Sequence, residues 1–261
     1  MIKKRKIYYS RTYRRLQRFG VKEILIVAAM IIPALILFFI FLSKLTMFMS
    51  WAAVKVLSAE FDGILAQIVQ MKVPFFGKIF IVEMPTIYPD KFQIFMNLII
   101  MCIFFLILGT GKRKTKPLSI FLMITVVIHM INCLFLLFAS NFFPYTVYQY
   151  SDLYIKQQIG IWFIFIILAG MVTGCVGRKG FLTKFFAFVS IMIYSVVFGV
   201  IRYILFLYLL QRFSILYMAL MFFVLGPFFD FLYLVGIYAL FINRIEAVYD
   251  TSKEREEWRW S

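Results

Sequence analysis

Long apolar runs separated by short polar or basic segments dominate the chain. Runs of about 20 apolar residues are the length that crosses a bilayer as a helix, and no soluble domain of this size buries so many. The pattern therefore predicts an all-α integral membrane protein with six transmembrane helices. The predicted spans are 24–43, 93–110, 117–139, 158–175, 185–209 and 216–242.

The first apolar run, "EILIVAAMIIPALILFFIFL" (23–42), predicts a retained helix. It is longer than the apolar core of a signal peptide, and no small-residue cleavage site follows it.

Residues 44–92, between the first two spans, follow a different pattern. Apolar residues at helical spacing with charges between them predict an amphipathic helix over 48–70, lying along the membrane interface. In 71–90, β-branched and aromatic residues surround a Gly77-Lys78 turn and predict a short β-hairpin.

Composition and charge give the orientation. The 261 residues are 64% hydrophobic and carry a formal net charge of +16. Twenty of the 28 Lys and Arg residues lie on one predicted side, in 1–23, 111–116, 177–184 and 243–261. This is the positive-inside pattern. Both termini are therefore expected in the cytoplasm, and 44–92 outside a plasma (inner) membrane.

The same topology divides the chain and indicates its partners. We expect a basic tail (1–23), the first span (24–43), the outer segment, a five-helix bundle (93–242) and a second tail (243–261). The basic tail is suited to anionic lipid headgroups, and 48–90 to a protein partner. Nucleic acid is excluded as a partner because topology already explains the basic charge.

Three ionisable residues, His129, Arg202 and Asp230, fall inside the predicted spans, where such groups usually face a bundle interior. Arg202 is predicted in the outer third of its span, and Gly226-Pro227 is expected to kink the last span before Asp230. If "SILYMALM" (214–221) lies partly along the outer interface, the two charges are at similar depth, which leaves two alternatives. Either they form an ion pair, or Arg202 extends to the headgroups while Asp230 meets water or a hydroxyl.

His129 and Asn132 share a helix face and predict either a proton or ligand site or hydrogen bonding between helices. Gly170 and Gly174 have the small-xxx-small spacing that permits close helix contact.

No cofactor is expected. The sequence has no phosphate-binding glycine loop, and its one histidine builds no metal or haem site. Cys102, Cys133 and Cys175 have neither zinc nor disulfide spacing and are read as small apolar residues.

The segment "GRKGFLTKFFAFVSIMIYSVVFGVIRYILFLYLL" (177–210) joins a basic turn to an arginine-bearing helix, and "GKIFIVEMP" (77–85) belongs to the predicted hairpin. These two segments resemble the basic turn, the helix and the hairpin of the exosortase/archaeosortase family of membrane transpeptidases. The resemblance covers roughly 150–242 and implies that Arg202 matches the family's arginine.

The family's other catalytic elements are missing. Gly199 stands at the expected Asn, Tyr150-Ser151 replaces the Cys-Ser pair, and the last span has no His. Cys175 is predicted at the opposite membrane face from Arg202, so the two cannot form one site. Cysteine transpeptidation is therefore not expected. Ser151 beside Asp152 leaves a hydrolase or transferase open, although no outward-facing base is visible.

Three function classes follow. The first is an exosortase-type scaffold without transpeptidase activity, acting in envelope assembly such as surface-protein sorting or exopolysaccharide export. The second is a small transporter or permease subunit with a pathway lined by His129, Asn132, Arg202 and Asp230. The third is a non-catalytic structural subunit of a membrane complex.

Overall fold

A computed structural model describes residues 21–61, 63, 65–110, 117–175, 181–226, 228–230, 232, 235–236 and 239–240. The first tail, the basic segment 111–116, most of the basic turn 177–184 and the last tail lie outside these residues. The side chain of Cys175 lies outside them too.

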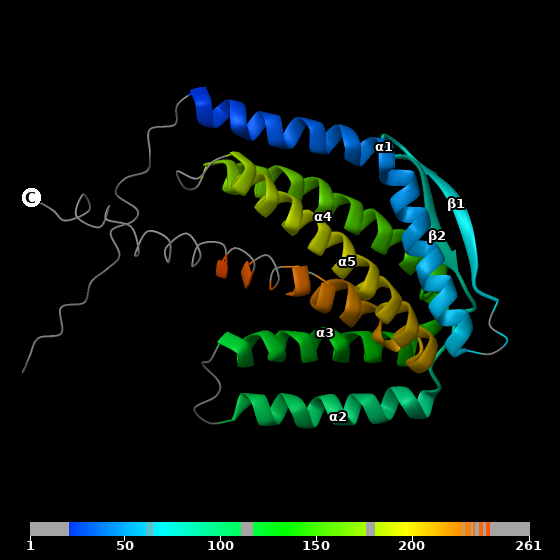
Figure 1. The fold of residues 1–261 in the computed structure, drawn as a ribbon. Helices are drawn as coiled ribbons and strands as arrows, with labels where there is room; N and C mark the ends of the chain where they lie inside the picture. The colour runs from blue at the N-terminus through cyan, green and yellow to red at the C-terminus, as the bar shows by residue number, and fades with distance from the viewer. Residues whose placement is uncertain are drawn as a thin grey trace, which may run out of the picture.

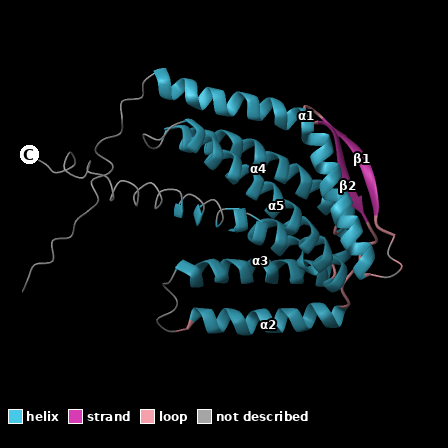
Figure 2. Ribbon diagram, viewed as in Figure 1, coloured by secondary structure: helices cyan, strands magenta, loops and turns pink. Residues whose placement is uncertain are grey.

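The described fold is a helical bundle with one two-stranded sheet at one end, as Figure 2 shows. The elements in chain order are α1 (Val21–Glu60), β1 (Gln67–Val73), β2 (Gly77–Glu83), α2 (Lys91–Gly109), α3 (Pro117–Ala139), η3 (Ser140–Phe142), α4 (Val147–Cys175), α5 (Phe181–Phe213), η4 (Ile215–Tyr217), α6 (Met218–Leu220) and η5 (Met221–Leu225).

Five helices in the described residues are long and apolar enough, by length and composition, to cross a membrane, as a multi-span membrane protein requires. They are α1 to α5. The sixth predicted span, 216–242, is described only in part. It opens with a 3₁₀ turn, a short α-turn and a π-turn instead of one regular helix.

The helix ends separate into two groups (Figure 1). The β1–β2 hairpin lies with the start of α2, the end of α3, the start of α4 and the end of α5, and we call this the hairpin end. The start of α1 lies at the opposite end, together with the helix ends that flank 111–116 and 176–180. The predicted alternation of loops is therefore present in the bundle.

The prediction of a separate helix over 48–70 was wrong. α1 continues from the first apolar run to Glu60, and 67–70 belongs to β1. Pro33 lies inside α1, and Thr46 donates a hydroxyl hydrogen bond back to the Ser43 carbonyl at 3.1 Å. Both features bend helices, and Figure 1 shows α1 bent so that its last part runs beside the hairpin.

The predicted hairpin exists, but its strands begin earlier and end earlier. The strands are antiparallel from Gln67↔Glu83 to Val73↔Gly77, and the turn is 74–76. Residues 84–90 form neither helix nor strand.

α4 begins at Val147, eleven residues before the predicted span 158–175. The tyrosine-rich end of the segment between the predicted spans 117–139 and 158–175 is therefore helical, and it is partly buried. Its fully buried side chains pack with those of α1, β2 and α5 in the main core, which lies at the hairpin end. α2 and α3 form an antiparallel pair that contacts the 215–220 segment. α4 also packs along α5.

Candidate functional site: a buried arginine cluster

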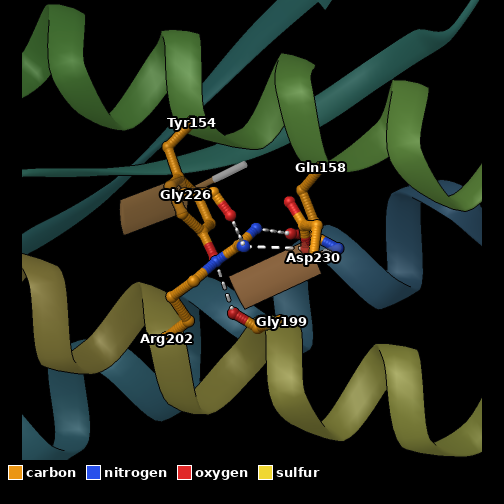
Figure 3. A network of polar contacts seen from close by, with 6 residues as sticks. All are labelled: Tyr154, Gln158, Gly199, Arg202, Gly226 and Asp230. Atoms are coloured by element: carbon orange, nitrogen blue, oxygen red, sulfur yellow. Dashed lines mark hydrogen bonds and ion pairs between the residues drawn. The ribbon is translucent and has the colours of Figure 1, made fainter. Parts of the chain in front are cut away.

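Arg202 is buried in α5, where its side chain donates hydrogen bonds to two neighbouring elements (Figure 3). Nε donates to Tyr154 Oη at 2.8 Å, and Nη2 donates to Gln158 Oε1 at 2.7 Å. Nη1 donates to the Gly226 carbonyl at 2.9 Å. The guanidinium therefore links α5 to α4 and to the segment after η5.

Asp230 supplies the opposite charge. Its Oδ1 lies 2.7 Å from Arg202 Nη1, and the two side chains are 11% and 2% exposed. Of the two alternatives, the structure has the ion pair, and Arg202 does not extend to the headgroups.

Helical spacing brings these residues together. Tyr154 and Gln158 are one turn apart on α4, and Gly199 and Arg202 are one turn apart on α5. Tyr154 Oη donates to the Gly199 carbonyl at 3.0 Å while it accepts from Arg202. Both hydrogen-bonding roles of this phenol are thus filled inside the bundle.

Gly199 allows α4 and α5 to approach at this point. A Cβ built on Gly199 would lie 2.9 Å from Cδ and Nε2 of Gln158. The Asn that the exosortase resemblance leads one to expect here would displace Gln158 from Arg202. This departure from the family pattern therefore belongs to the cluster's own packing.

Ser151 is fully buried and holds the hairpin. Its hydroxyl forms a short hydrogen bond with the phenol of Tyr203, and both oxygens accept from the Val82 amide, at 3.0 and 3.1 Å. Asp152 instead accepts from Lys156 Nζ at 2.6 Å. Ser151 therefore has a phenol and an amide as its neighbours, and the carboxylate of Asp152 faces elsewhere.

His129 and Asn132 lie in a second polar group, on α3. Asn132 Nδ2 donates to the Leu216 carbonyl at 2.6 Å, and the His129 ring stacks on Tyr217 with centroids 5.1 Å apart. Tyr217 Oη in turn donates to Asn97 Oδ1 of α2 at 2.7 Å. These contacts join α2 and α3 to residues 216 and 217. None of the contacts of this group in the described residues is with Arg202 or Asp230.

Gly170 and Gly174 lie against α1. A Cβ on Gly170 would lie 2.4 Å from Ile31 Cγ1, and one on Gly174 would lie 2.5 Å from Val27 Cγ2. The small-residue spacing marks a close crossing of α1 and α4.

Sequence reasoning missed Tyr154, Gln158 and the Gly226 carbonyl as partners of Arg202. The i, i+4 spacing of Tyr150, Tyr154, Gln158 and Trp162 was the available signal, since all four lie on one face of α4 and are at most 2% exposed. Three of their polar atoms, Tyr150 Oη, Gln158 Nε2 and Trp162 Nε1, have no hydrogen-bond partner among the described residues.

The contacts of Arg202 join α5 to α4 and to residues 226–230. The described residues contain no group of three or more His, Cys, Asp or Glu side chains placed to hold a metal ion. Cys133 is buried and Cys102 is exposed, both as free thiols.

No protein-family model, curated protein or solved structure matches the chain. The resemblance to the exosortase family therefore stays a prediction from the motifs.

Proposed function

We propose that this protein is a non-catalytic scaffold subunit in the plasma membrane, acting in envelope assembly such as surface-protein sorting or exopolysaccharide export. One observation carries the proposal: the arginine that the exosortase resemblance singles out is occupied by partners from its own chain. A guanidinium with 3% exposure and four internal partners is engaged in packing.

The reaction chemistry of a transpeptidase also lacks its parts here. A nucleophile needs a base within hydrogen-bond reach, whereas Ser151 contacts Tyr203 and the Val82 amide. These contacts favour a role in holding the hairpin over a role in acyl transfer.

The hairpin offers an element for docking a partner. On β2, the backbone groups of Phe80 and Val82 face away from β1, because they bond to side chains of α1, α4 and α5. Residues opposite each other in an antiparallel pair share this direction. Ile68 and Gln70, their partners in the register, therefore direct N–H and C=O groups to the free side of β1.

These free groups make β1 an edge to which an extended segment of another protein can add as a strand. β1 contains no proline, and its one charged residue is Lys72. Edge pairing of this kind requires the backbone N–H groups and tolerates most side chains.

Two variants at Gln70 test the docking proposal. Gln70→Pro removes the free N–H, and proline is tolerated on an edge strand whose N–H is not in the ladder. Gln70→Ala removes the same side chain but keeps the N–H. We expect a stoichiometric partner to co-purify with the wild type and with Gln70→Ala and to be lost with Gln70→Pro. Equal co-purification with both variants would contradict edge docking.

The envelope role is tested in a null strain. We expect altered anchoring of a surface protein or altered polysaccharide export, restored by the wild type and not by Arg202→Ala. Full rescue by Arg202→Ala, with the variant protein at wild-type abundance, would remove the support that the exosortase resemblance gives to this role.

Transport is a second candidate, favoured by the buried polar face of α4. Tyr150 Oη, Gln158 Nε2 and Trp162 Nε1 follow one helix face next to the Arg202–Asp230 pair, as pathway-lining groups do. Solute uptake by proteoliposomes that is abolished by Asp230→Asn or His129→Ala, with the fold intact, would favour this candidate over the scaffold.

A further inference from the structure

The turn of the hairpin places two lysines directly opposite each other. Lys72 and Lys78 are register partners on β1 and β2. Like charges in such a pair repel, and neither lysine forms an ion pair in the part of the chain that the structure describes. Both line a shallow depression together with Val73, Pro74, Phe75 and Gly77. An anionic group in this depression would remove the repulsion.

Phe75, at the tip of the same turn, has an unfavourable backbone conformation and an exposed apolar side chain. Its side chain is 99% exposed, and its backbone has φ of 67°, in the left-handed region where bulky residues are outliers. Glycine would relax this backbone, as it does at Gly77 with φ of 77°. A large aromatic in this position therefore indicates a surrounding less polar than water.

The turn also touches the membrane-spanning surface of the bundle. The Phe76 ring stacks on Phe39 of α1 with centroids 6.1 Å apart, and Phe39 in turn contacts Phe163 of α4 at 6.3 Å. Phe39 is 46% exposed and lies in the first apolar span. Figure 1 shows the turn between β1 and β2 beside α1. The tip is thus at the height where the apolar surface meets the hairpin end.

We propose that the hairpin turn is a phospholipid site: Lys72 and Lys78 bind the phosphate of an anionic lipid in the adjoining leaflet, and Phe75 inserts at the boundary between headgroups and acyl chains. Ammonium–phosphate contacts are charge-assisted hydrogen bonds. Aromatic rings prefer this boundary, where the exposure of Phe75 no longer costs free energy. The site is distinct from the β1 edge at Ile68 and Gln70, and it does not depend on the proposed scaffold function.

The test uses the full chain in nanodiscs of phosphatidylcholine with a minor share of phosphatidylglycerol. The phosphatidylglycerol retained by the protein is counted by native mass spectrometry. Lys72→Gln/Lys78→Gln removes both direct phosphate contacts, each worth several-fold in anionic-lipid binding, and should lower the retention at least tenfold. Lys55→Gln/Lys91→Gln removes the same charge from residues that do not line the depression, so only the general surface attraction weakens and the loss should be clearly smaller than tenfold.

Phe75→Gly gives an independent arm, because it should relax the backbone. We expect this variant to unfold in detergent at the wild-type temperature or above it, and still to retain less phosphatidylglycerol in nanodiscs. Inorganic phosphate added in detergent should not bind measurably, since a free phosphate has no acyl chains beside which Phe75 can insert.

Equal loss of lipid from both double-lysine variants, or from neither, would overturn the proposal. It would also be overturned if Lys72→Gln/Lys78→Gln kept its lipid but lost a co-purifying protein, because the lysines would then belong to a protein interface. Failure of edge docking would instead appear only with Gln70→Pro, so the two results are separable.

Discussion

The buried guanidinium of Arg202 is held by hydrogen bonds to several residues and neutralised by an ion pair. Three uncharged acceptors, from Tyr154, Gln158 and Gly226, fix the guanidinium, and among the described residues Asp230 neutralises it. Removing one partner of a buried ion pair destabilises a protein by roughly 3–5 kcal/mol, because the remaining charge stays out of water without a counter-ion. The stability of this region therefore depends on the pair more than on either residue alone.

This dependence predicts a non-additive double-mutant cycle. Asp230→Asn leaves the guanidinium without a counter-ion, and Arg202→Gln leaves the carboxylate alone. The double variant leaves no charge, so it should be more stable than the sum of the single losses predicts, by about 1–3 kcal/mol. The measurement is thermal unfolding of the purified chain in detergent. Losses that simply add would mean that the 2.7 Å contact contributes nothing as a pair.

The sequence offered the Arg202–Asp230 contact as one of two alternatives and did not indicate the rest of the cluster. In one regular helix over 216–242, Asp230 would lie deeper than Arg202, because rise per residue is constant. The two charges reach similar depth only if the segment after Ser214 runs partly along the interface before the Gly226-Pro227 kink. The contacts to Tyr154 and Gln158 depend on which faces of α4 and α5 meet and on the start of α4 at Val147. Hydropathy had marked that tyrosine-rich stretch as a loop, since polar atoms count equally whether they face water or a partner.

At the scale of elements, the hairpin is held by hydroxyl groups. Thr46 accepts from the Phe80 amide and Ser50 donates to its carbonyl, both from α1. Ser151 of α4 and Tyr203 of α5 accept from Val82. Buried backbone groups need partners, and these side chains supply them along the inner edge of β2. Packing stabilises the later part of α1 as well, since Ala53 and Leu57 are buried in one core with Ile79 and Ile81 of β2.

The paired acceptors at Val82 predict a graded loss of protection at this amide. Ser151→Ala or Tyr203→Phe alone leaves the amide one acceptor, but it also removes the hydrogen bond between the two buried hydroxyls, so each should destabilise the chain by roughly 1–3 kcal/mol. Together they leave the buried Val82 N–H unpaired, and the double variant should be less stable than either single variant. Exchange of the Val82 amide measured by hydrogen–deuterium mass spectrometry should accelerate most in the double variant. Equally rapid exchange in Ser151→Ala alone would show that the two acceptors are not equivalent.

Across the whole molecule, the apolar runs were enough to predict most helices. They were not enough to predict how the helices pack against one another. The runs at 93–110 and 117–139 became α2 and α3 almost unchanged, because both helices expose apolar surface along most of their length. The segment after Ser214 was predicted as one span. In the structure, residues 215–225 instead contain 3₁₀, α and π turns, and the Gly226 carbonyl accepts from Arg202. Irregular backbone at membrane depth is tolerated where protein groups satisfy it, and hydropathy carries no record of such partners.

The arrangement of basic segments leads to a prediction about orientation. The helix ends that flank 111–116 and 176–180 lie opposite the hairpin, and so does the start of α1, which follows the basic residues 1–20. Lys and Arg in such segments are retained in the cytoplasm, so the hairpin end should face outward. Leu65, 80% exposed near the hairpin, and Val21, 74% exposed at the start of α1, are suitable reporters of the two ends.

We expect Leu65→Cys to react with a membrane-impermeant thiol reagent on intact cells, and Val21→Cys to react only after permeabilisation. Both substitutions are made in a chain with Cys102, Cys133 and Cys175 replaced by Ala, so that the introduced thiol is the one measured. The reversed pattern would turn the bundle over. The β1 edge and the Lys72–Lys78 turn would then face the cytoplasm, where neither a surface-protein substrate nor an exported polysaccharide is presented to them. The scaffold proposal would fail with the orientation, whereas the lipid site would persist, because phosphate recognition by two lysines is the same in either leaflet.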